Sequence, residues 1–402
     1  MISEQTRKRL KNQSDILRTI RRKGATSRSF ISKSCGIRKA SVTNICRDLV
    51  DRGSLNEKTP GFYRSEIELS SEYWRSLSIY INSEKIVATI VDHNGKDYEE
   101  WTQKIGNRKT PEKIVSSIVS LIKKVLESEK KFIGIGISVP GIVNAEKGIC
   151  LSAVNLGRWH NFPLVEEIVT RLPAHCPNIV IENDANAGLM GNHWFGGFGE
   201  KLENSLYISL GEGIGCAQLM DGNIIRGCRF SAGEIGCLPS GNEKRPCSCG
   251  KMDCLQTYCG ELGIIQSVNR ISKTPTSYSI SELCKLAKDN PKIRQSLDLS
   301  YQPLVQQICT MVALTDPAQI VVGCPDPNMD SIIPEILSAG LKRQLGWTDN
   351  EYIPVLAGLH PIKSGILGAA VSVFKKAFQD EPPLQYSQTN AFLCSVNNIA
   401  SD

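Results

Sequence analysis

The sequence has 402 residues, of which 22% are charged and 41% hydrophobic, as in a globular protein with a sizeable core to bury. This length exceeds what one hydrophobic core usually supports, so two or three domains are expected. The N-terminus is polar and basic, and no run of 18 apolar residues follows it, which predicts neither a secretory signal nor a membrane span. The 15 cysteines then indicate a reducing cytosol, with some thiols on a metal and the rest buried.

Charge is divided unevenly along the chain. Residues 1–65 hold 16 lysines and arginines against 5 acidic residues, a formal charge of +11, whereas the remainder holds 31 against 36, a charge of −5. A basic segment on an acidic body is typical of nucleic-acid binding. Charge alone leaves a solvated basic face as an equal alternative.

The pattern of residues 1–70 favours a winged helix-turn-helix domain. A first helix is expected to end near Gly24, and Ser27 can cap a second, Arg28 to Cys35, that Gly36 closes. A third helix, from about Arg38, has a repeating apolar face formed by Val42, Ile45, Cys46 and Leu49. Its other face carries donors suited to base edges and phosphates: Arg38, Lys39, Ser41, Thr43, Asn44 and Arg47. Gly53 to Leu55 and Ile67 to Leu69 can form the two strands of a wing.

The predicted partner of this domain is a double-stranded DNA operator. We expect a homodimer to bind a roughly palindromic site through residues 1–65, with Arg21, Arg22 and Arg28 on the phosphate backbone rather than on bases. The alternative interpretation is a three-helix module that binds another protein.

A second motif is a group of four cysteines within 18 residues: Cys237, Cys247, Cys249 and Cys254. Four thiolates satisfy the closed tetrahedron of a structural zinc site. Gly250 provides the tight turn inside the Cys-x-Cys-Gly-x-x-x-Cys segment, and Cys237 would reach in from the preceding strand or loop. The alternative is a set of buried free thiols, but the spacing favours Zn²⁺.

From about residue 70 onward, β-rich runs alternate with helical ones: residues 77–91, then a helix over 111–127, then residues 132–139. This alternation is typical of α/β folds. The polar residues after Pro383 are expected to be loosely held.

The segment Gly-Glu-Ile-Gly at 233–236, followed by the cysteine motif, resembles the signature of the ROK family of sugar-responsive repressors and sugar kinases. The run from Ile31 to Gly53 is similar to the winged helix-turn-helix of its repressors, which the free-standing kinases lack. Where those repressors often carry a Gly-Arg-Arg-Pro-like wing, this chain has Gly61-Phe62-Tyr63-Arg64. The resemblance to the ROK body covers nearly all of residues 74–378.

The resemblance implies an α/β protein with a two-lobed actin-like ATPase fold behind the DNA-binding domain. The expected boundaries are a DNA-binding domain over 1–70, lobe 1 over 71–190 completed by about 368–380, lobe 2 with the zinc knuckle over 191–367, and a polar tail over 383–402. The resemblance also implies a homo-oligomer, either a dimer or a tetramer.

The nucleotide-binding features of the family's kinases are altered in this chain. Their first phosphate loop, Asp-x-Gly-Gly-Thr, aligns with residues 80–84, which end in Asn82-Ser83-Glu84 without glycine. In their second, Gly-Thr-Gly-x-Gly, Glu212 replaces the hydroxyl, and Gly323-Cys324-Pro325 stands where glycines lie beside the adenosine. These changes predict that the chain is not an enzyme.

The sugar-binding features are better kept, above all in Glu-Asn-Asp-Ala-Asn-Ala at 182–187. Asp184 occupies the position of the kinase general base and is expected to hold a ligand hydroxyl without catalysis. The resemblance implies six ligand contacts: Gly141, Asn155, Asn183, Asp184, Glu234 and Gln256. The alternative is a fold scaffold in which Asp184 caps a helix. Cys237 and Gln256 replace the family's usual histidine and glutamate, which weakens two sugar contacts.

The sequence therefore predicts a cytoplasmic, sequence-specific DNA-binding regulator of carbohydrate metabolism, a repressor that senses a sugar or sugar derivative and has no kinase activity. One alternative is a sugar kinase with an accessory DNA-binding domain. Another is a repressor that has lost its sugar ligand and responds to a protein partner.

Overall fold

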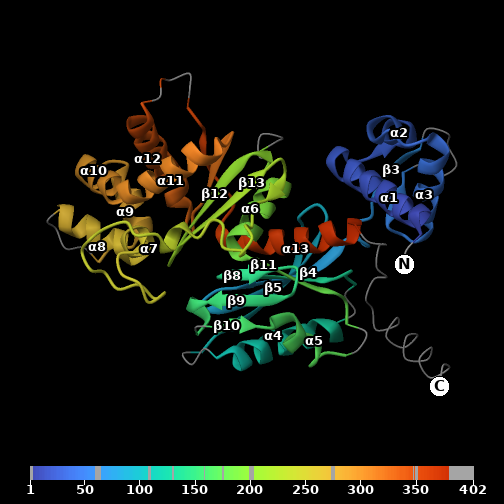
Figure 1. Ribbon diagram of the computed structural model, residues 1–402, viewed down its shortest axis with the longest axis horizontal. Coiled ribbons are helices and arrows are strands. Elements are labelled where there is room, and N and C mark those ends of the chain that lie inside the picture. The colour runs from blue at the N-terminus through green and yellow to red at the C-terminus, as the bar shows by residue number, and fades with distance from the viewer. Residues whose placement is uncertain are drawn as a thin grey trace. The chain divides into compact units, whose positions relative to one another are not determined.

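The computed structural model describes residues 3–58, 65–106, 110–128, 131–157, 159–173, 176–198, 203–272, 277–346, 348 and 352–379 (Figure 1). The chain forms two compact units. Unit 1 comprises Met1–Ile137, Pro163–Ile181 and Ala369–Asp402, and unit 2 comprises Ser138–Phe162 and Glu182–Gly368. None of the described helices combines the length and the apolar character that crossing a bilayer requires.

Unit 1 begins with three helices and a small antiparallel sheet of strand order β1-β3-β2. Their bounds are α1 (Glu4–Lys23), β1 (Thr26–Ser27), α2 (Arg28–Cys35), α3 (Lys39–Asp51), β2 (Leu55–Glu57) and β3 (Glu66–Leu69). The predicted caps are confirmed, because the Ser27 hydroxyl accepts from the amide of Phe30 at 3.2 Å and Gly36 ends α2 at φ 65°. The predicted wing segment Gly61–Arg64 lies outside the described residues.

The apolar face predicted for the third helix forms the core of this N-terminal region. Val42, Ile45, Cys46 and Leu49 are all buried, as are Ile16, Leu17 and Ile20 of α1 and Ile31 of α2. Trp74 anchors the region to the rest of unit 1. Its indole nitrogen donates to the carbonyl of Ser54 at 2.8 Å, and its ring meets that of Phe378 edge-on at 4.9 Å.

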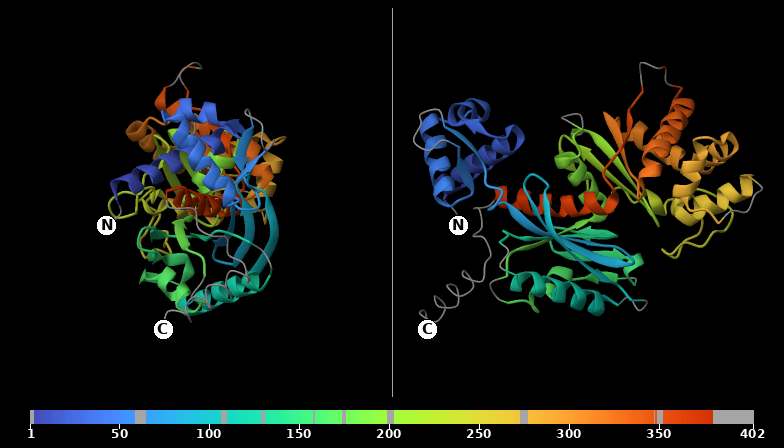
Figure 2. Two further views of the ribbon diagram at one scale, coloured as in Figure 1. Left: turned by 90° about the vertical axis from the view of Figure 1, so that its right-hand side faces the viewer. Right: turned by 180° about the vertical axis from the view of Figure 1, so that it is seen from behind.

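The main sheet of unit 1 has strand order β11-β7-β4-β5-β6. Its strands are β4 (Arg75–Ile81), β5 (Lys85–Asp92), β6 (Asp97–Lys104), β7 (Ile135–Val139) and β11 (Ile179–Asn183). Helices α4 (Pro111–Glu127) and α5 (Leu164–Val169) cover one face, and the C-terminal half of α13 (Pro361–Gln379) covers the other (Figure 2). Gly136 of β7 allows this close approach, since a side chain there would meet the carbonyl of Ala369.

Unit 2 contains two sheets. The smaller has the order β10-β9-β8 and the larger the order β14-β13-β12-β15-β16. The strands are β8 (Ile142–Asn144), β9 (Ile149–Ala153), β10 (Trp159–Phe162), β12 (Ser205–Leu210), β13 (Ile214–Met220), β14 (Asn223–Ile224), β15 (Gln319–Gly323) and β16 (Val355–Ala357).

Helices α7 to α12 of unit 2 pack with its larger sheet around one apolar core, while α6 packs on β12 and β13. The bounds of these helices are α6 (Asp184–Phe195), α7 (Leu255–Cys259), α8 (Glu261–Ser272), α9 (Ile280–Ala287), α10 (Pro291–Ser300), α11 (Gln302–Thr315) and α12 (Pro327–Leu345). Unit 2 also has the 3-10 turns η1 (Val154–Leu156) and η3 (Ile235–Cys237). The alternation of strands and helices predicted from the sequence is confirmed.

These compact units differ from the predicted lobe boundaries. Residues 138–162 and the start of α6, which the sequence placed in lobe 1, belong with unit 2. The reason is that α6 packs on β12 and β13, and the side chain of Asn183 bonds the carbonyl of Gly141. The N-terminal 70 residues belong with unit 1.

Candidate functional site

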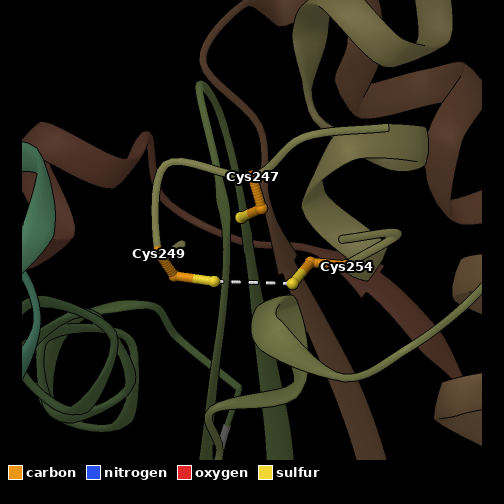
Figure 3. Close-up of side chains that lie close together, drawn as sticks. All are labelled: Cys247, Cys249 and Cys254. Carbon is orange, nitrogen blue, oxygen red and sulfur yellow. Dashed lines mark hydrogen bonds between the residues drawn. The ribbon is translucent and has the colours of Figure 1, made fainter. Parts of the chain in front are cut away.

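Three of the four predicted cysteine ligands lie together in unit 2. The sulfur atoms of Cys247, Cys249 and Cys254 are all within 4.8 Å of one another, and those of Cys249 and Cys254 are 3.5 Å apart (Figure 3). Cys254 is 1% exposed and Cys247 9%. Three neighbouring sulfur donors, two of them on buried residues, suit a thiophilic metal ion.

A short hairpin sets this spacing. The amide of Gly250 donates to the carbonyl of Cys247 at 3.0 Å, and the amide of Cys247 donates to the carbonyl of Lys251 at 2.9 Å. Gly250 has φ 90°, a conformation that glycine adopts without strain. The role of the predicted turn glycine is therefore confirmed.

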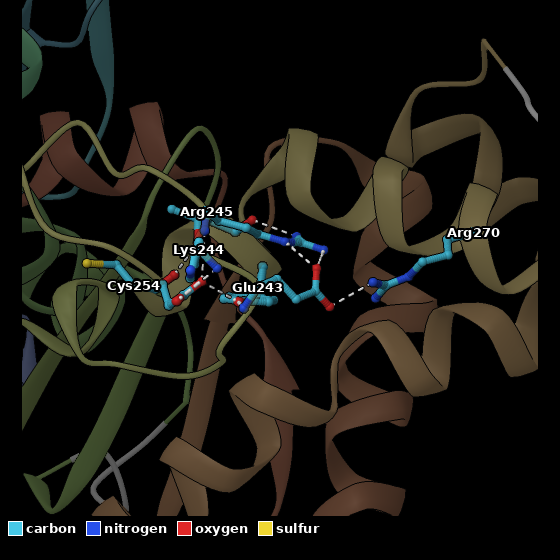
Figure 4. Close-up of polar contacts among 8 residues, drawn as sticks. Glu243, Lys244, Arg245, Cys254 and Arg270 are labelled. Atoms are coloured by element: carbon cyan, nitrogen blue, oxygen red, sulfur yellow. Dashed lines mark hydrogen bonds and ion pairs between the residues drawn. The ribbon is translucent and has the colours of Figure 1, made fainter.

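A network of polar contacts, here called the polar frame, flanks the hairpin and is formed by Glu243, Lys244, Arg245, Asp253, Tyr258 and Arg270 (Figure 4). The carboxylate of Asp253 accepts from the backbone amides of Lys244 and Arg245 and from the hydroxyl of Tyr258. The guanidinium of Arg245 stacks on the Tyr258 ring at 4.2 Å and pairs with Glu243, which also binds Arg270. Sequence patterns did not single out this frame, because its partners are spread over 28 residues.

The fourth predicted ligand, Cys237, lies beside the triad but is not part of it. Its carbonyl accepts from the thiol of Cys254 at 3.6 Å, and its own thiol contacts that of Cys249. Burial, with the neighbouring thiol of Cys249, raises the pKa of Cys237 to about 12. A bound cation would favour the thiolate form of the sulfurs that ligate it. The three grouped thiols, with Cys237 beside them, are donors of the type that Zn²⁺ takes.

Cys247 differs from the other thiols of the group. Burial acts to raise its pKa, but the backbone amide of Cys249 and the side-chain amide of Gln256 donate to its sulfur and bring the pKa below the usual value. Gln256 Nε2 lies 2.9 Å from Cys247 Sγ. Gln256, predicted as a ligand contact, directs its amide nitrogen toward the cysteine group.

The predicted ligand residues gather where β11 ends and α6 begins. Asn183, rather than Asp184, caps α6, because its side-chain oxygen accepts from the amide of Asn186 at 2.9 Å. Its amide nitrogen donates to the carbonyl of Gly141 at 2.8 Å and to Asp184 Oδ1 at 3.0 Å. Asn183 therefore positions its neighbours and has little capacity left for a ligand.

Asp184 and Glu234 are neighbouring carboxyl groups with perturbed acidity. Burial raises the pKa of Asp184 to about 6, although backbone amides and the Asn183 amide oppose the shift. Burial, and then the charge of Asp184, raise the pKa of Glu234 to about 7. Two partly exposed carboxyls that share one electrostatic environment are suited to bind hydroxyl groups, because they can both accept and, when protonated, donate.

Glycines bring the backbone close around these carboxyls. Gly141 has φ 102°, and a side chain there would lie 2.1 Å from the carbonyl of Ser152. Gly233, directly before Glu234, has φ 88°, and a side chain there would lie 2.2 Å from the carbonyl of Cys216. Both positions require glycine. Asn155 is exposed on η1, and within the described residues it bonds none of the other predicted contacts.

Arg226 belongs to this site, although no sequence pattern indicates it. Arg226 pairs with the nearly buried carboxylate of Glu182, whose other oxygen accepts from the amide of Asn183 and from the side chain of Asn186. Arg226 also closes the loop before Glu234, since its carbonyl accepts from the amide of Ala232 at 3.1 Å. No motif marks Arg226, because its partner is 44 residues away.

The positions that match the kinase phosphate loops make hydrogen bonds within the protein. In unit 1, Asn82 Oδ1 accepts from the amides of Glu84 and Lys85 at 2.9 and 2.8 Å. In unit 2, the carbonyl of Gly211 accepts from the amide of Glu261 at 3.1 Å, and Glu212 is exposed. Gly323 lies against the buried ring of Tyr207, and Cys324 is buried.

The predicted DNA-facing residues lie on the outer side of α3. Arg38, Lys39, Asn44 and Arg47 are exposed, whereas Ser41 and Thr43 are half-buried. The Thr43 hydroxyl donates to the carbonyl of Lys39 at 2.9 Å. Within the part of the chain that the structure describes, neither Arg38, Lys39 nor Arg47 forms an ion pair.

The arginines expected on the DNA backbone have different surroundings. Arg28 is bound to Glu57 at 3.0 Å and is half-buried. Burial, and then the charge of Arg22, lower the pKa of Arg21 to about 10. Of the three, Arg22 is the exposed one.

Comparison with known proteins places this geometry in a family. A sequence model described as the ROK family matches residues 76–376. A xylose repressor from Caldicellulosiruptor bescii is 28% identical over 333 residues, which cover 77% of this chain and 81% of the repressor. A glucokinase from Halalkalibacterium halodurans is 34% identical over 179 residues, which cover 42% of this chain and 52% of the kinase.

Among solved structures, the crystal structure of a ROK family transcriptional regulator, a homolog of the E. coli MLC protein, has a TM-score of 0.80 at 22% identity. The match covers 94% of this chain and 98% of the regulator, so the shared fold extends into the N-terminal region. The α/β fold is thus that of ROK regulators and kinases. The chain belongs to the ROK family.

Proposed function

We propose that this protein is a sequence-specific DNA-binding regulator of carbohydrate metabolism, a repressor whose ROK body binds a sugar or sugar derivative and is held together by a structural zinc ion. The N-terminal three helices and their small sheet act as a winged helix-turn-helix. A homo-oligomer would present two such domains to a palindromic operator.

The observation that carries this proposal is the outer face of α3. Four exposed donors, Arg38 at the N-cap and Lys39, Asn44 and Arg47 within α3, lie opposite the buried face of this helix. Asparagine pairs with adenine and arginine with guanine or phosphate. The +11 charge of residues 1–65 adds the electrostatic attraction that a polyanion requires. The repressor among the relatives supports the same assignment.

The proposal is tested by selecting genomic DNA fragments with the full-length protein. We expect one motif of roughly palindromic form to be enriched. Asn44→Ala should weaken binding to that motif by about 1–3 kcal/mol and change binding to random DNA little, because Asn44 would contact base edges. Binding is measured by fluorescence anisotropy over a range of salt concentrations.

Arg22→Ala is the matched control, since it would remove a phosphate contact. It should weaken binding to both kinds of DNA alike and reduce the salt dependence by about one counterion. Failure to enrich any motif, or DNA binding that survives deletion of residues 1–65, would remove the repressor assignment.

The glucokinase relative keeps a second candidate open, a sugar kinase with an accessory DNA-binding domain. The occupied turn at Asn82 opposes it. In this turn two backbone amides that would be available to a phosphate are satisfied by the Asn82 side chain, and Glu84 adds a negative charge. We therefore expect no sugar-dependent ATP turnover.

A coupled assay over a panel of sugars measures this turnover directly. Formation of a sugar phosphate by the unmodified protein, lost in Asp184→Asn, would instead assign kinase activity, because Asp184 occupies the position of the general base in the family's kinases. The same variant also serves as the control for contaminating kinases, because their activity would persist in the Asp184→Asn preparation.

The ligand site is proposed to centre on Asp184 and Glu234, with the Gly141 backbone beside them. A regulator needs a ligand that prefers one arrangement of the protein over another. A sugar would meet these two carboxyls through its hydroxyl groups. If no sugar raises the thermal stability of the protein, the alternative is a regulator that responds to a protein partner.

A further inference from the structure

Gln256 makes a contact that a sugar ligand would not require. It lies in the first turn of α7, two residues after Cys254, and its amide nitrogen donates to Cys247 Sγ at 2.9 Å. Cys247 is the most N-terminal member of the cysteine triad. Metal-bound ligands in proteins are commonly held by such outer hydrogen bonds, which orient the ligand atom and tune its charge.

The other end of the carboxamide is enclosed by backbone. A side chain at Gly213 would lie 3.0 Å from Gln256 Oε1, and one at Gly236 would lie 3.5 Å from it. These glycines belong to the β12–β13 turn and to η3. The oxygen therefore occupies the space that their missing side chains leave, while the nitrogen faces the sulfur.

Charge explains why an amide serves better than a carboxylate at this position. A zinc ion with four thiolates has a formal charge of −2. A carboxylate beside Cys247 would add a further negative charge and would have no hydrogen to donate. An amide has the same shape, is neutral, and donates. The two departures from the family pattern, Cys237 for histidine and Gln256 for glutamate, are therefore compatible with one another.

We propose that Gln256 is a positioning residue of the metal centre, whose side-chain amide holds the Cys247 thiolate in place and compensates its charge. This inference rests on the proposed metal centre and is independent of the proposed sugar and DNA binding. It predicts that the metal affinity of this chain depends on a glutamine donor at position 256.

The experiment uses the full-length protein, stripped of metal and titrated with Zn²⁺ against a chromophoric chelator. We expect Gln256→Glu to lower the zinc affinity by about 10- to 100-fold, the range for loss of an outer hydrogen bond. Gln256→Met, which keeps the size but removes the donor, should lower it by about tenfold. Co²⁺ provides a second readout. Without the donor, the thiolate-to-cobalt charge-transfer band should move to lower energy, because the sulfur electrons are less stabilised.

Gln307→Glu is the control for charge. Gln307 lies on α11, and its amide bonds Ser240 Oγ at 3.5 Å, near the cysteine group but away from its sulfurs. This variant should bind zinc as the unmodified protein does. A similar loss in Gln307→Glu would mean that any added charge weakens the site, and the role of Gln256 would be rejected.

Two further outcomes are separable. If both Gln256 variants bind zinc within about twofold of the unmodified protein and leave the cobalt band unmoved, Gln256 does not position Cys247. If the unmodified protein binds no metal at all, the metal centre itself is wrong. Circular dichroism of the metal-saturated variants shows that each is folded.

Discussion

Replacement of Cys249 by serine should abolish binding of one zinc ion per chain and loosen the segment from η3 to α7. The metal would join this segment through four ligands, and metal-binding free energy is folding free energy in such sites, about 10–16 kcal/mol in small zinc modules. The large apolar core of unit 2 remains, so a lowered unfolding temperature is expected rather than complete unfolding.

Native mass spectrometry of freshly purified protein measures the metal, and thermal unfolding with and without a chelator measures its contribution. Cys228→Ser is the matched control, because Cys228 is an exposed free cysteine of the same unit. It should retain one zinc and the unmodified unfolding temperature. Freshly purified protein without bound metal, or a chelator that leaves the unfolding temperature unchanged, would contradict the structural role.

Replacement of Asp184 by asparagine should abolish sugar binding and stabilise the ligand-free protein at neutral pH. Asparagine retains an oxygen that can accept from the Ala185 amide, as Asp184 does now at 2.9 Å. It lacks the charge that burial disfavours. The variant should therefore lose sugar binding and gain stability. Substitutions in binding sites often have this combined effect.

The pH dependence follows from the direction of the pKa shift. The folded protein holds the Asp184 proton up to about pH 6, whereas the unfolded chain releases it near pH 4. Stability from this group is therefore fully present below about pH 4 and is lost as the pH rises through about 6. The advantage of Asp184→Asn over the unmodified protein should grow across this range to about 1–3 kcal/mol.

Chemical unfolding at pH 4, 6 and 8 measures this difference, and a thermal-shift screen over sugars measures binding. Asp289→Asn is the charge control, because Asp289 is exposed in the turn after α9. It should bind sugar normally and show no growing advantage. A constant stability difference for Asp184→Asn at all three pH values would mean that its carboxyl is not perturbed, and sugar binding that survives would place the ligand elsewhere.

Features that depend on neighbours in the chain were predictable from the sequence. Ser27 and Gly36 delimit α2 because capping and left-handed glycine are local properties. The apolar face of α3 follows from helical periodicity, and the cysteine triad follows from a spacing of eight residues around Gly250. The resemblance to the ROK family likewise rested on short motifs.

Features that depend on partners far apart in the chain were decided by the tertiary structure. The Asp184 position was recognised, but its raised pKa results from burial, which no local pattern reports. Arg226 pairs with Glu182, which lies 44 residues away in the chain, and no sequence pattern near Arg226 predicts this pair. The resemblance implied a ligand contact for Gln256, but no local pattern indicates that its side-chain oxygen lies against Gly213 and Gly236 and its amide nitrogen donates to Cys247. Local sequence determines which groups are available, and packing determines which of them meet, because desolvation and long-range contacts arise only when the chain is folded.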